Sequence, residues 1–418
     1  MGHLPLTDSA LRERYRQVRA GSTHLSSFLS AEDHGVQSMP DASPTKWHLA
    51  HTTWFFETVV LLAHADGYRP FSEDYFVLFN SYYESLGPRH PRPQRGVLTR
   101  PSLDEVKSYR AHVDEAMEKL LSSDRAAETV SYLVTLGLHH EQQHQELILT
   151  DIKHAFSLNL ILPALAKLEP RRKETGAPLA WREEAGGMAE IGHSGERFAF
   201  DNESPRHTVM LRPYRLASRP VTCGEYLAFM KDGGYSTPTL WLSEGWATVA
   251  RESWNAPLYW IERDGSWRIF TLGGVRDLDP EEPVAHVSFF EAAAFAQWAG
   301  KRLPTEFEWE HAARNAPLRG NFLDTSVLHP RAAAPGEGYT QLFGDVWEWT
   351  RSSYDPYPGF RAFDGALAEY NGKFMVGQLV LRGGSCATPV GHIRSSYRNF
   401  FPPAARWQFS GIRLAEDS

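Results

Sequence analysis

Two histidines four residues apart, His140 and His144, are the first candidates for metal ligands in this sequence. In a helix, residues at i and i+4 lie on one face, so both imidazoles would point the same way. Leucine and isoleucine residues share that face, which directs the two rings into the protein interior. A buried imidazole without a partner costs roughly 1–3 kcal/mol, so the pair requires hydrogen-bond partners or a metal ion.

A third histidine, His51, is predicted to point inward from another helix, because it shares a face with Trp47 and Trp54. Three inward histidines from two helices would form a site with open coordination positions, as catalytic metal centres have. Neutral imidazoles suit zinc, iron and copper equally well, so this chemistry alone leaves the metal open. Spacing alone also allows His48 or His139 to take the place of a neighbouring ligand.

Two other interpretations fit the same residues. The stretch from His140 to His144 matches the H-E-x-x-H motif of zinc proteases, with Glu141 as general base. The extended motif fails because the position six residues on is Thr150, and Glu169, the nearest downstream carboxylate in range, lies in a predicted linker. Inward histidines can also be ordinary core residues held by hydrogen bonds, as in a binding module without catalytic activity.

The elements that must position these side chains follow from the hydrophobic pattern. Apolar residues recur at three and four positions, which predicts four helices over residues 9–29, 44–63, 102–121 and 125–156. Pro44 suits the first turn of the second helix, with Ser43 as its N-cap. Four long helices joined by loops favour a bundle within residues 1–167.

The second half of the chain has a different pattern. Residues 168–182 are charged and turn-forming and are predicted to be a linker. From residue 183 to 418, β-like runs at 188–192, 208–216 and 378–382 alternate with short helical patterns at 222–231, 288–299 and 305–314. This is typical of an α+β domain with many loops, and makes the whole chain α+β.

Composition excludes several classes of protein. Thirteen Trp and sixteen Tyr are too many for a disordered chain. A formal charge of -8 disfavours binding to nucleic acid or anionic lipid, and two cysteines cannot form a disulfide framework. No apolar run is long enough to span a membrane, and the first residues do not resemble a signal peptide. We therefore expect a cytoplasmic protein with no nucleic-acid or membrane partner, of undetermined oligomeric state.

Six segments resemble a known enzyme family. The segments SPTKWHLAH (43–51) and HEQQHQE (140–146) resemble the DinB-like four-helix bundle of the ergothioneine-biosynthesis sulfoxide synthases (EgtB). Four more segments resemble their second domain, which is similar to formylglycine-generating enzyme and has a C-type-lectin-like fold: RLPTEFEWE (302–310), GDVWEW (344–349), RGGS (382–385) and GIRL (411–414). The two resemblances follow the family's domain order and span nearly the whole chain.

The resemblance implies an activity and its cofactor. His51, His140 and His144 would bind a non-haem Fe(II), and O2 would be the oxidant. The enzyme would join the sulfur of cysteine to C2 of the hercynine imidazole and oxidise it to a sulfoxide. Gln143 and Asn399 match family residues of the hercynine pocket. Aromatic residues there would attract the trimethylammonium group of hercynine through their ring faces; the match in this chain is Phe400.

The resemblance also assigns further residues. Tyr82 or Tyr83 would deliver a proton during C–S coupling, although an aromatic pair closing a core is the simpler interpretation. Arg92 and Arg95 would hold the carboxylate of the thiol substrate, the alternative being a solvated basic loop. Phe401 occupies the position at which family members that use γ-glutamylcysteine have an acidic residue, which favours free cysteine as the donor.

Two related activities fit the sequence less well. Formylglycine-generating oxidases bind copper through two cysteines five residues apart, but here the residue five positions after Cys386 is Gly391. Synthases of 5-histidylcysteine sulfoxide act on histidine and usually carry an added methyltransferase domain; no glycine-rich cofactor loop of that kind is present. The same sulfoxide chemistry with γ-glutamylcysteine remains the main alternative.

Overall fold

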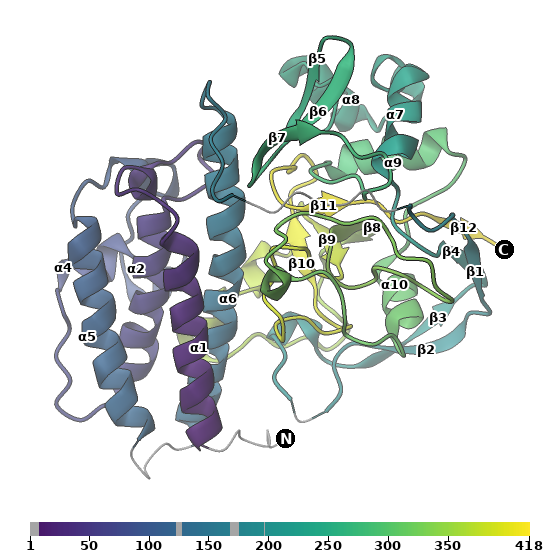
Figure 1. Ribbon diagram of the computed structural model, residues 1–418. Helices are drawn as coiled ribbons and strands as arrows, with labels where there is room; N and C mark the ends of the chain where they lie inside the picture. Colours follow the sequence, from purple (N-terminus) through teal and green to yellow (C-terminus); the bar gives the residue numbers. More distant parts are fainter. Residues whose placement is uncertain (1–7, 123–127, 168–174, 196) are drawn as a thin grey trace. The chain divides into compact units, whose positions relative to one another are not determined.

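The computed structural model describes residues 8–122, 128–167, 175–195 and 197–418, which form two compact units (Figure 1). Unit 1 comprises Met1–Ile161 together with Gly195–Phe200 and Ala362–Tyr370. Unit 2 comprises Leu162–Ser194, Asp201–Arg361 and Asn371–Ser418. No helix among the described residues is both long and apolar enough to cross a membrane.

The sequence predicts a single boundary between the two domains, but two short segments of the second half belong to unit 1. They fold with the helices because their aromatic side chains pack on residues of α6. The ring of Phe198 stacks on that of His139, with centroids 4.3 Å apart. Residues 168–174 of the predicted linker lie outside the described residues, and a strand already begins at Trp181.

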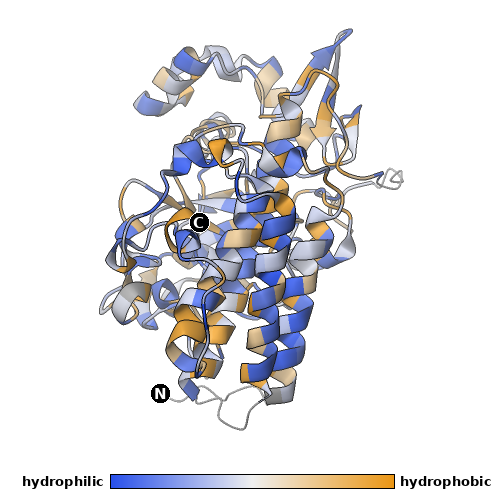
Figure 2. Cartoon of the chain, turned by 90° about the vertical axis from the view of Figure 1, so that its left-hand side faces the viewer, coloured by the Kyte–Doolittle hydropathy of each residue, from blue (hydrophilic) through white to orange (hydrophobic). Residues whose placement is uncertain are grey.

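Among the described residues, unit 1 contains four main helices, as the hydrophobic pattern predicts. They are α1 (Asp8–Ser26), α2 (Thr45–Phe55), α5 (Leu103–Leu121) and α6 (Glu128–Ser157). A π-helical turn (Phe56–Leu61) and α3 (Leu62–His64) extend α2, and the short α4 (Asp74–Leu78) follows. Helices α1 and α2 both pack against α6 (Figure 1). The helices in the lower part of Figure 2 carry both hydrophilic and hydrophobic residues. On α5 the buried residues Val106, Tyr109, Val113 and Met117 recur at spacings of three and four, so its apolar stripe faces inward.

Side-chain capping explains the start of α5 but not that of α2. A reciprocal capping box between Ser102 and Glu105 fixes the start of α5. The prediction that Ser43 caps α2 is wrong, because Pro44 is the capping residue and no side chain caps that end. The hydroxyl of Ser43 instead accepts a hydrogen bond from Arg95, and its backbone N–H donates to Asp151.

A glycine on α6 controls how closely α2 and α6 approach each other. A Cβ at Gly137 would lie 2.6 Å from a ring carbon of Phe56 and 2.9 Å from one of Phe55. Both phenylalanines are completely buried, so neither ring can move aside without opening the core. Gly137 precedes His140 by about one helical turn, and the close approach therefore sets the spacing at the histidines.

The described residues of unit 2 form four small sheets. One has the strand order β1 (Trp181–Glu184), β4 (Tyr214–Ala217), β12 (Ala415–Asp417). The largest is β10 (Asn399–Phe401), β9 (Leu379–Arg382), β8 (Trp347–Ser353), β11 (Ser410–Gly411). The others pair β2 (Gly187–Ile191) with β3 (His207–Leu211), and β5 (Trp260–Arg263) with β6 (Ser266–Thr271) and β7 (Gly274–Asp277). Helices α7 (Cys223–Lys231), α8 (Ser243–Glu252), α9 (Phe289–Trp298) and α10 (Glu306–Ala313) complete the unit.

The β-like runs at 188–192, 208–216 and 378–382 match β2, β3, β4 and β9, and the three helical patterns match α7, α9 and α10. Helix α8 and the strands β1, β5–β8 and β10–β12 were not predicted. The signal for the β5–β6 hairpin is Asp264-Gly265, whose φ angles are 52° and 71°. An Asp-Gly pair with positive φ at both residues is typical of a two-residue hairpin turn.

The Trp- and Gly-rich motifs of unit 2 form a buried structural network. Glu348 of β8 accepts hydrogen bonds from the guanidinium of Arg413, both side chains being fully buried. The indole N–H of Trp309 on α10 donates to the same carboxylate at 2.6 Å. Glu348, Arg413 and Trp309 therefore stabilise the fold of unit 2.

Replacing Glu348→Ala is expected to lower the free energy of unfolding by about 3–5 kcal/mol, because it leaves the Arg413 cation buried and unpaired. Urea unfolding followed by tryptophan fluorescence measures this change. The matched control is Glu252→Ala, which breaks an exposed ion pair with Arg251 and should change stability by about 0.5 kcal/mol or less. Equal effects of the two substitutions would contradict the structural role.

Candidate metal centre

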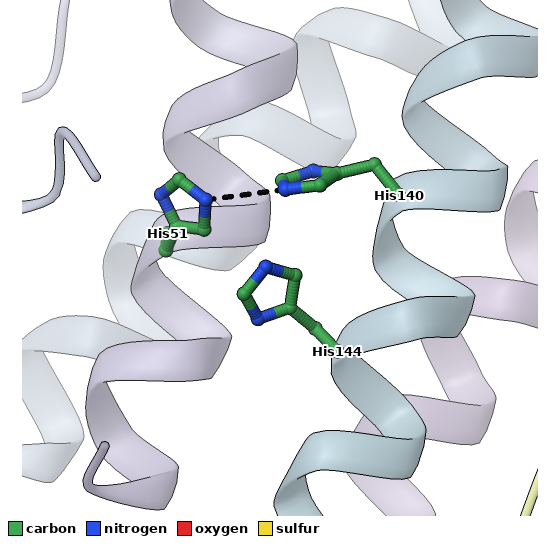
Figure 3. A group of neighbouring side chains, drawn as sticks. All are labelled: His51, His140 and His144. Atoms are coloured by element: carbon green, nitrogen blue, oxygen red, sulfur yellow. Dashed lines mark hydrogen bonds between the residues drawn. The ribbon is translucent and has the colours of Figure 1, made fainter. Parts of the chain in front are cut away.

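Three histidine side chains converge between α2 and α6 (Figure 3). One ligand nitrogen each from His51, His140 and His144 lies within 4.8 Å of the others, and all three residues are buried. The Nε2 atoms of His51 and His140 are 3.2 Å apart. Two nitrogens bound to one metal ion at about 2.1 Å each would lie roughly 3.0–3.4 Å apart. The observed separation is therefore that of neighbouring ligands.

The outer nitrogens of two rings are held in a way that suits metal binding. His51 Nδ1 lies 2.6 Å from the backbone oxygen of Phe79, an acceptor, so Nδ1 carries the proton and Nε2 has the free lone pair. His144 Nδ1 lies 2.8 Å from Nδ1 of His48. The Nδ1 of His140 is buried and has no partner in the described part of the chain.

Burial keeps the three rings neutral. It lowers the pKa of His140 to about 3 and holds the pKa values of His51 and His144 well below the usual range. Neighbouring imidazoles add to this effect, because each disfavours a second positive charge nearby. A neutral imidazole is the form that binds metal ions.

Aromatic side chains surround the histidines. The Trp47 ring stacks on His51 with centroids 4.6 Å apart, and Trp54 stacks on the same ring at 5.7 Å. Phe55 lies 4.9 Å from His140. This apolar wall fixes the ring orientations and limits access of water to the nitrogens.

Glu141 points away from the histidines. Its carboxylate accepts hydrogen bonds from Arg19, Arg110 and Ser22, and it is completely buried. Burial opposes ionisation, yet the two guanidiniums lower its pKa to about 2. A carboxylate held by two cations cannot act as the general base of a zinc protease, so the H-E-x-x-H match is not a protease site in this fold.

The two neighbouring histidines have other roles. His48 lies behind His144, on the side of the ring away from Nε2. His139 stacks on Phe198 and contacts Arg14. In this geometry neither takes the place of a predicted ligand.

The two predicted carboxylate-binding arginines differ in environment. Both belong to a 3₁₀ segment, Arg92–Val97. Arg95 is buried, lies 3.3 Å from the centre of the Trp47 ring, and donates to the hydroxyls of Ser43 and Ser81. Arg92 is exposed and donates to a backbone oxygen.

The environment of Arg95 favours an anionic ligand. Burial, together with nearby Arg92 and Arg89, lowers its pKa to about 8, and its Nε has no partner within the described residues. Its hydrogen bonds go to neutral hydroxyls, so a bound carboxylate would supply the missing negative charge.

The tyrosine pair lies on the other side of the aromatic wall. Tyr83 is completely buried 5.5 Å from Trp54, and burial raises its pKa well above the ordinary value. Tyr82 is partly buried, between Tyr83 at 4.8 Å and Tyr370 at 6.2 Å.

Sequence reasoning missed one aromatic residue next to the histidines. The ring of Tyr370 lies 5.7 Å from His140, and its hydroxyl donates to Oε1 of Gln143, 227 positions away in the chain. No local pattern reveals such a distant contact. Since Oε1 of Gln143 accepts this hydrogen bond, the amide N–H groups are the part of that side chain that can donate.

The remaining predicted substrate residues lie on β10 of unit 2. Phe400 stacks on Tyr354 at 4.0 Å, and Phe401 contacts Trp407 at 5.5 Å. The side-chain oxygen of Asn399 accepts a hydrogen bond from the backbone of Phe400. Their roles stay predictions.

Removing one histidine should abolish metal binding. His140→Ala is expected to lose the tight binding of Co(II), a spectroscopic probe for Fe(II), because two imidazoles remain. His139→Ala is the matched control, one residue away on the same helix, and should bind Co(II) as the unsubstituted protein does. Absorption titration of each protein measures this, and unchanged binding by His140→Ala would contradict the site.

Comparison with known proteins identifies the domain type of each half of the chain. A model of the DinB superfamily matches residues 14–148, and a model of the Sulfatase-modifying factor enzyme 1-like domain matches residues 184–337 and 325–418. The Formylglycine-generating enzyme of Streptomyces coelicolor is 32% identical over 265 residues, which cover 53% of this chain and 81% of that protein.

Other relatives match along almost the full length. The Hercynine oxygenase of Mycolicibacterium thermoresistibile is 34% identical over 409 residues, covering 90% of this chain and 88% of that protein. The Hercynine oxygenase of Mycobacterium tuberculosis is 34% identical over 429 residues, covering 96% and 97%. With both domain types present in one chain, these matches show that the protein belongs to the hercynine oxygenase family, the sulfoxide synthases of ergothioneine biosynthesis, and is an oxidoreductase.

Proposed function

We propose that this protein is an Fe(II)- and O2-dependent sulfoxide synthase that joins the sulfur of cysteine to C2 of hercynine. The observation that supports this most directly is the buried three-histidine cluster, in a chain similar to hercynine oxygenases over most of its length. Its three neutral nitrogen donors suit Fe(II) and leave positions for substrates. A bound iron ion would supply the redox chemistry with O2.

The overall reaction balances with one O2. The C2–H bond of hercynine and the S–H bond of the thiol break, and a C–S bond and an S–O bond form. The second oxygen atom leaves as water with the two hydrogens. Coupling and sulfur oxidation each remove two electrons, which together reduce O2 completely.

Arg95 is proposed to bind the carboxylate of the thiol substrate. Its guanidinium is buried and, within the described residues, donates to the hydroxyls of Ser43 and Ser81 rather than to a carboxylate. Trp47 contacts both this guanidinium and the imidazole of His51. A thiol substrate whose carboxylate binds Arg95 would therefore be separated from the predicted ligand His51 by the ring of Trp47.

Gln143 and the tyrosine pair are proposed to act on the other substrate and on proton transfer. The hydrogen bond from Tyr370 fixes the amide of Gln143 so that its N–H groups can bind an imidazole nitrogen. Tyr82 or Tyr83 would donate the proton required during C–S coupling. Burial raises the pKa of the Tyr83 phenol, which favours its protonated form and makes it a weaker acid.

We propose free cysteine rather than γ-glutamylcysteine as the donor. The support is Phe401, an apolar residue in contact with Trp407, where an acidic residue would be expected for γ-glutamylcysteine. Asn399 and Phe400 are proposed contacts of hercynine. The stacked rings of Phe400 and Tyr354 offer a face of the kind that attracts a quaternary ammonium.

The reaction itself is the first test. The protein is reconstituted anaerobically with Fe(II), then exposed to O2 with hercynine or histidine as acceptor and cysteine or γ-glutamylcysteine as thiol donor. Products are analysed by mass spectrometry. We expect a hercynine–cysteine sulfoxide that requires iron and O2. Coupling with γ-glutamylcysteine alone would overturn the donor, coupling only with histidine would overturn the acceptor, and no coupling would overturn the function.

Arg95→Met should raise KM for cysteine by about 10–100-fold with a smaller change in KM for hercynine, because a charge-assisted carboxylate contact contributes about 1.5–3 kcal/mol. Arg92→Met removes a charge of the same 3₁₀ segment that is exposed, and its effect on the KM for cysteine should be smaller. Steady-state kinetics with each substrate varied in turn measure both. A larger effect of Arg92→Met would contradict the assignment to Arg95.

A further inference from the structure

A chain of hydrogen bonds leads from one predicted metal ligand to a buried carboxylate. His144 Nδ1 lies 2.8 Å from His48 Nδ1, and His48 Nε2 lies 3.1 Å from Oδ2 of Asp151. The exposed fractions of the His144, His48 and Asp151 side chains are 9%, 2% and 5%, so protein rather than solvent determines these contacts. The chain connects α2 with α6, because His48 is on α2 and the other two residues are on α6.

The chemistry of the end group sets the direction of each hydrogen bond. An ionised carboxylate only accepts, so His48 Nε2 carries a proton and donates to Asp151. In neutral His48 the Nδ1 atom is then an acceptor. His144 Nδ1 must therefore carry a proton and donate to it, which leaves Nε2 of His144 with its lone pair free. Figure 3 shows that this nitrogen of His144 points toward the rings of His51 and His140.

We infer that His48 and Asp151 are positioning residues that fix the tautomer and orientation of His144 as a metal ligand. This inference rests on the proposed metal site. The arrangement corresponds to the carboxylate–histidine pairs behind many metal sites, extended here by one imidazole. This arrangement would make Nε2 of His144 a stronger electron-pair donor to the metal and would hold the His144 ring in place.

The carboxylate is placed for this purpose. Asp151 is two helical turns beyond His144, so it lies on the same face of α6. Its Oδ2 also accepts the backbone N–H of Ser43 at 2.8 Å, which anchors it to the segment before α2. Its Oδ1 is buried with no hydrogen-bond partner among the residues described.

The three predicted ligands therefore have unequal support. His51 is held by a neutral backbone oxygen, and His140 Nδ1 has no partner among the described residues. Among the described residues, only His144 is connected by hydrogen bonds, through His48, to a carboxylate. We expect the bond from His144 to the metal to depend most on residues outside the ligand set.

The test measures metal affinity without substrates. Asp151→Asn keeps the size of the side chain and an acceptor oxygen but removes the charge. His48→Gln keeps a donor for Asp151 and removes the nitrogen that faces His144. Glu57→Gln is the matched control, since Glu57 is a buried carboxylate of unit 1 held by the hydroxyls of Tyr68 and Tyr109 at 2.6 Å.

Co(II) affinity is determined by competition with a chelator, and the Co(II) absorption spectrum reports the ligand field. Circular dichroism melting of the metal-free proteins shows that each variant folds. We expect Asp151→Asn and His48→Gln to bind Co(II) about 10–100-fold more weakly, with altered spectra. Glu57→Gln should keep the affinity and spectrum of the unsubstituted protein.

Failure of this inference differs from failure of the metal site. If the unsubstituted protein binds Co(II) and His140→Ala does not, but both test variants behave like Glu57→Gln, the positioning role is overturned and the metal site stands. If the unsubstituted protein does not bind Co(II), or His140→Ala binds it equally well, both proposals are overturned. A loss confined to the two test variants supports the inference.

Discussion

The close packing of α2 against α6 is the constraint on which the candidate site depends. His51 comes from one helix and His140 from the other, and their Nε2 atoms approach to 3.2 Å. That approach is possible because Gly137 has no side chain where the rings of Phe55 and Phe56 pack. A larger residue would separate the helices by an amount comparable to the tolerance of a metal site, which is a few tenths of an ångström.

Buried charge reinforces the same packing from an adjacent face of α6. Glu141 is held by Arg19 of α1 and Arg110 of α5, so the helix is tied to two others at the turn that carries His140. The alternation of roles along α6 follows from helix geometry, since consecutive residues point about 100° apart. One face presents imidazoles to the site, and the next presents a carboxylate to the bundle core. A motif that resembles a protease site thus combines a ligand pair with a structural ion pair.

The polar groups of the site differ in how many of their hydrogen bonds are formed. This difference indicates which kinds of ligand they favour. Glu141 has all its partners, as a structural group should. Arg95 and the Nδ1 of His140 are buried with unmet hydrogen-bonding capacity in the described residues. Such groups are expensive to bury in a protein that binds nothing, so they favour an anionic substrate group beside Trp47 and a polar partner behind His140.

The sequence by itself determined the four helices, the inward direction of the three histidines and the family, because helical periodicity and short motifs are local properties. It could not show what Glu141 contacts, since that depends on which helices pack against its face of α6. Nor could it identify Tyr370 or the chain from His144 to Asp151. Tyr370 approaches His140 only through tertiary folding of a segment more than 200 residues away, whereas Asp151 lies on the ligand face in sequence but acquires its role only when α2 places His48 beside it. The local sequence pattern determines which way a side chain points, and tertiary packing determines which residues it contacts.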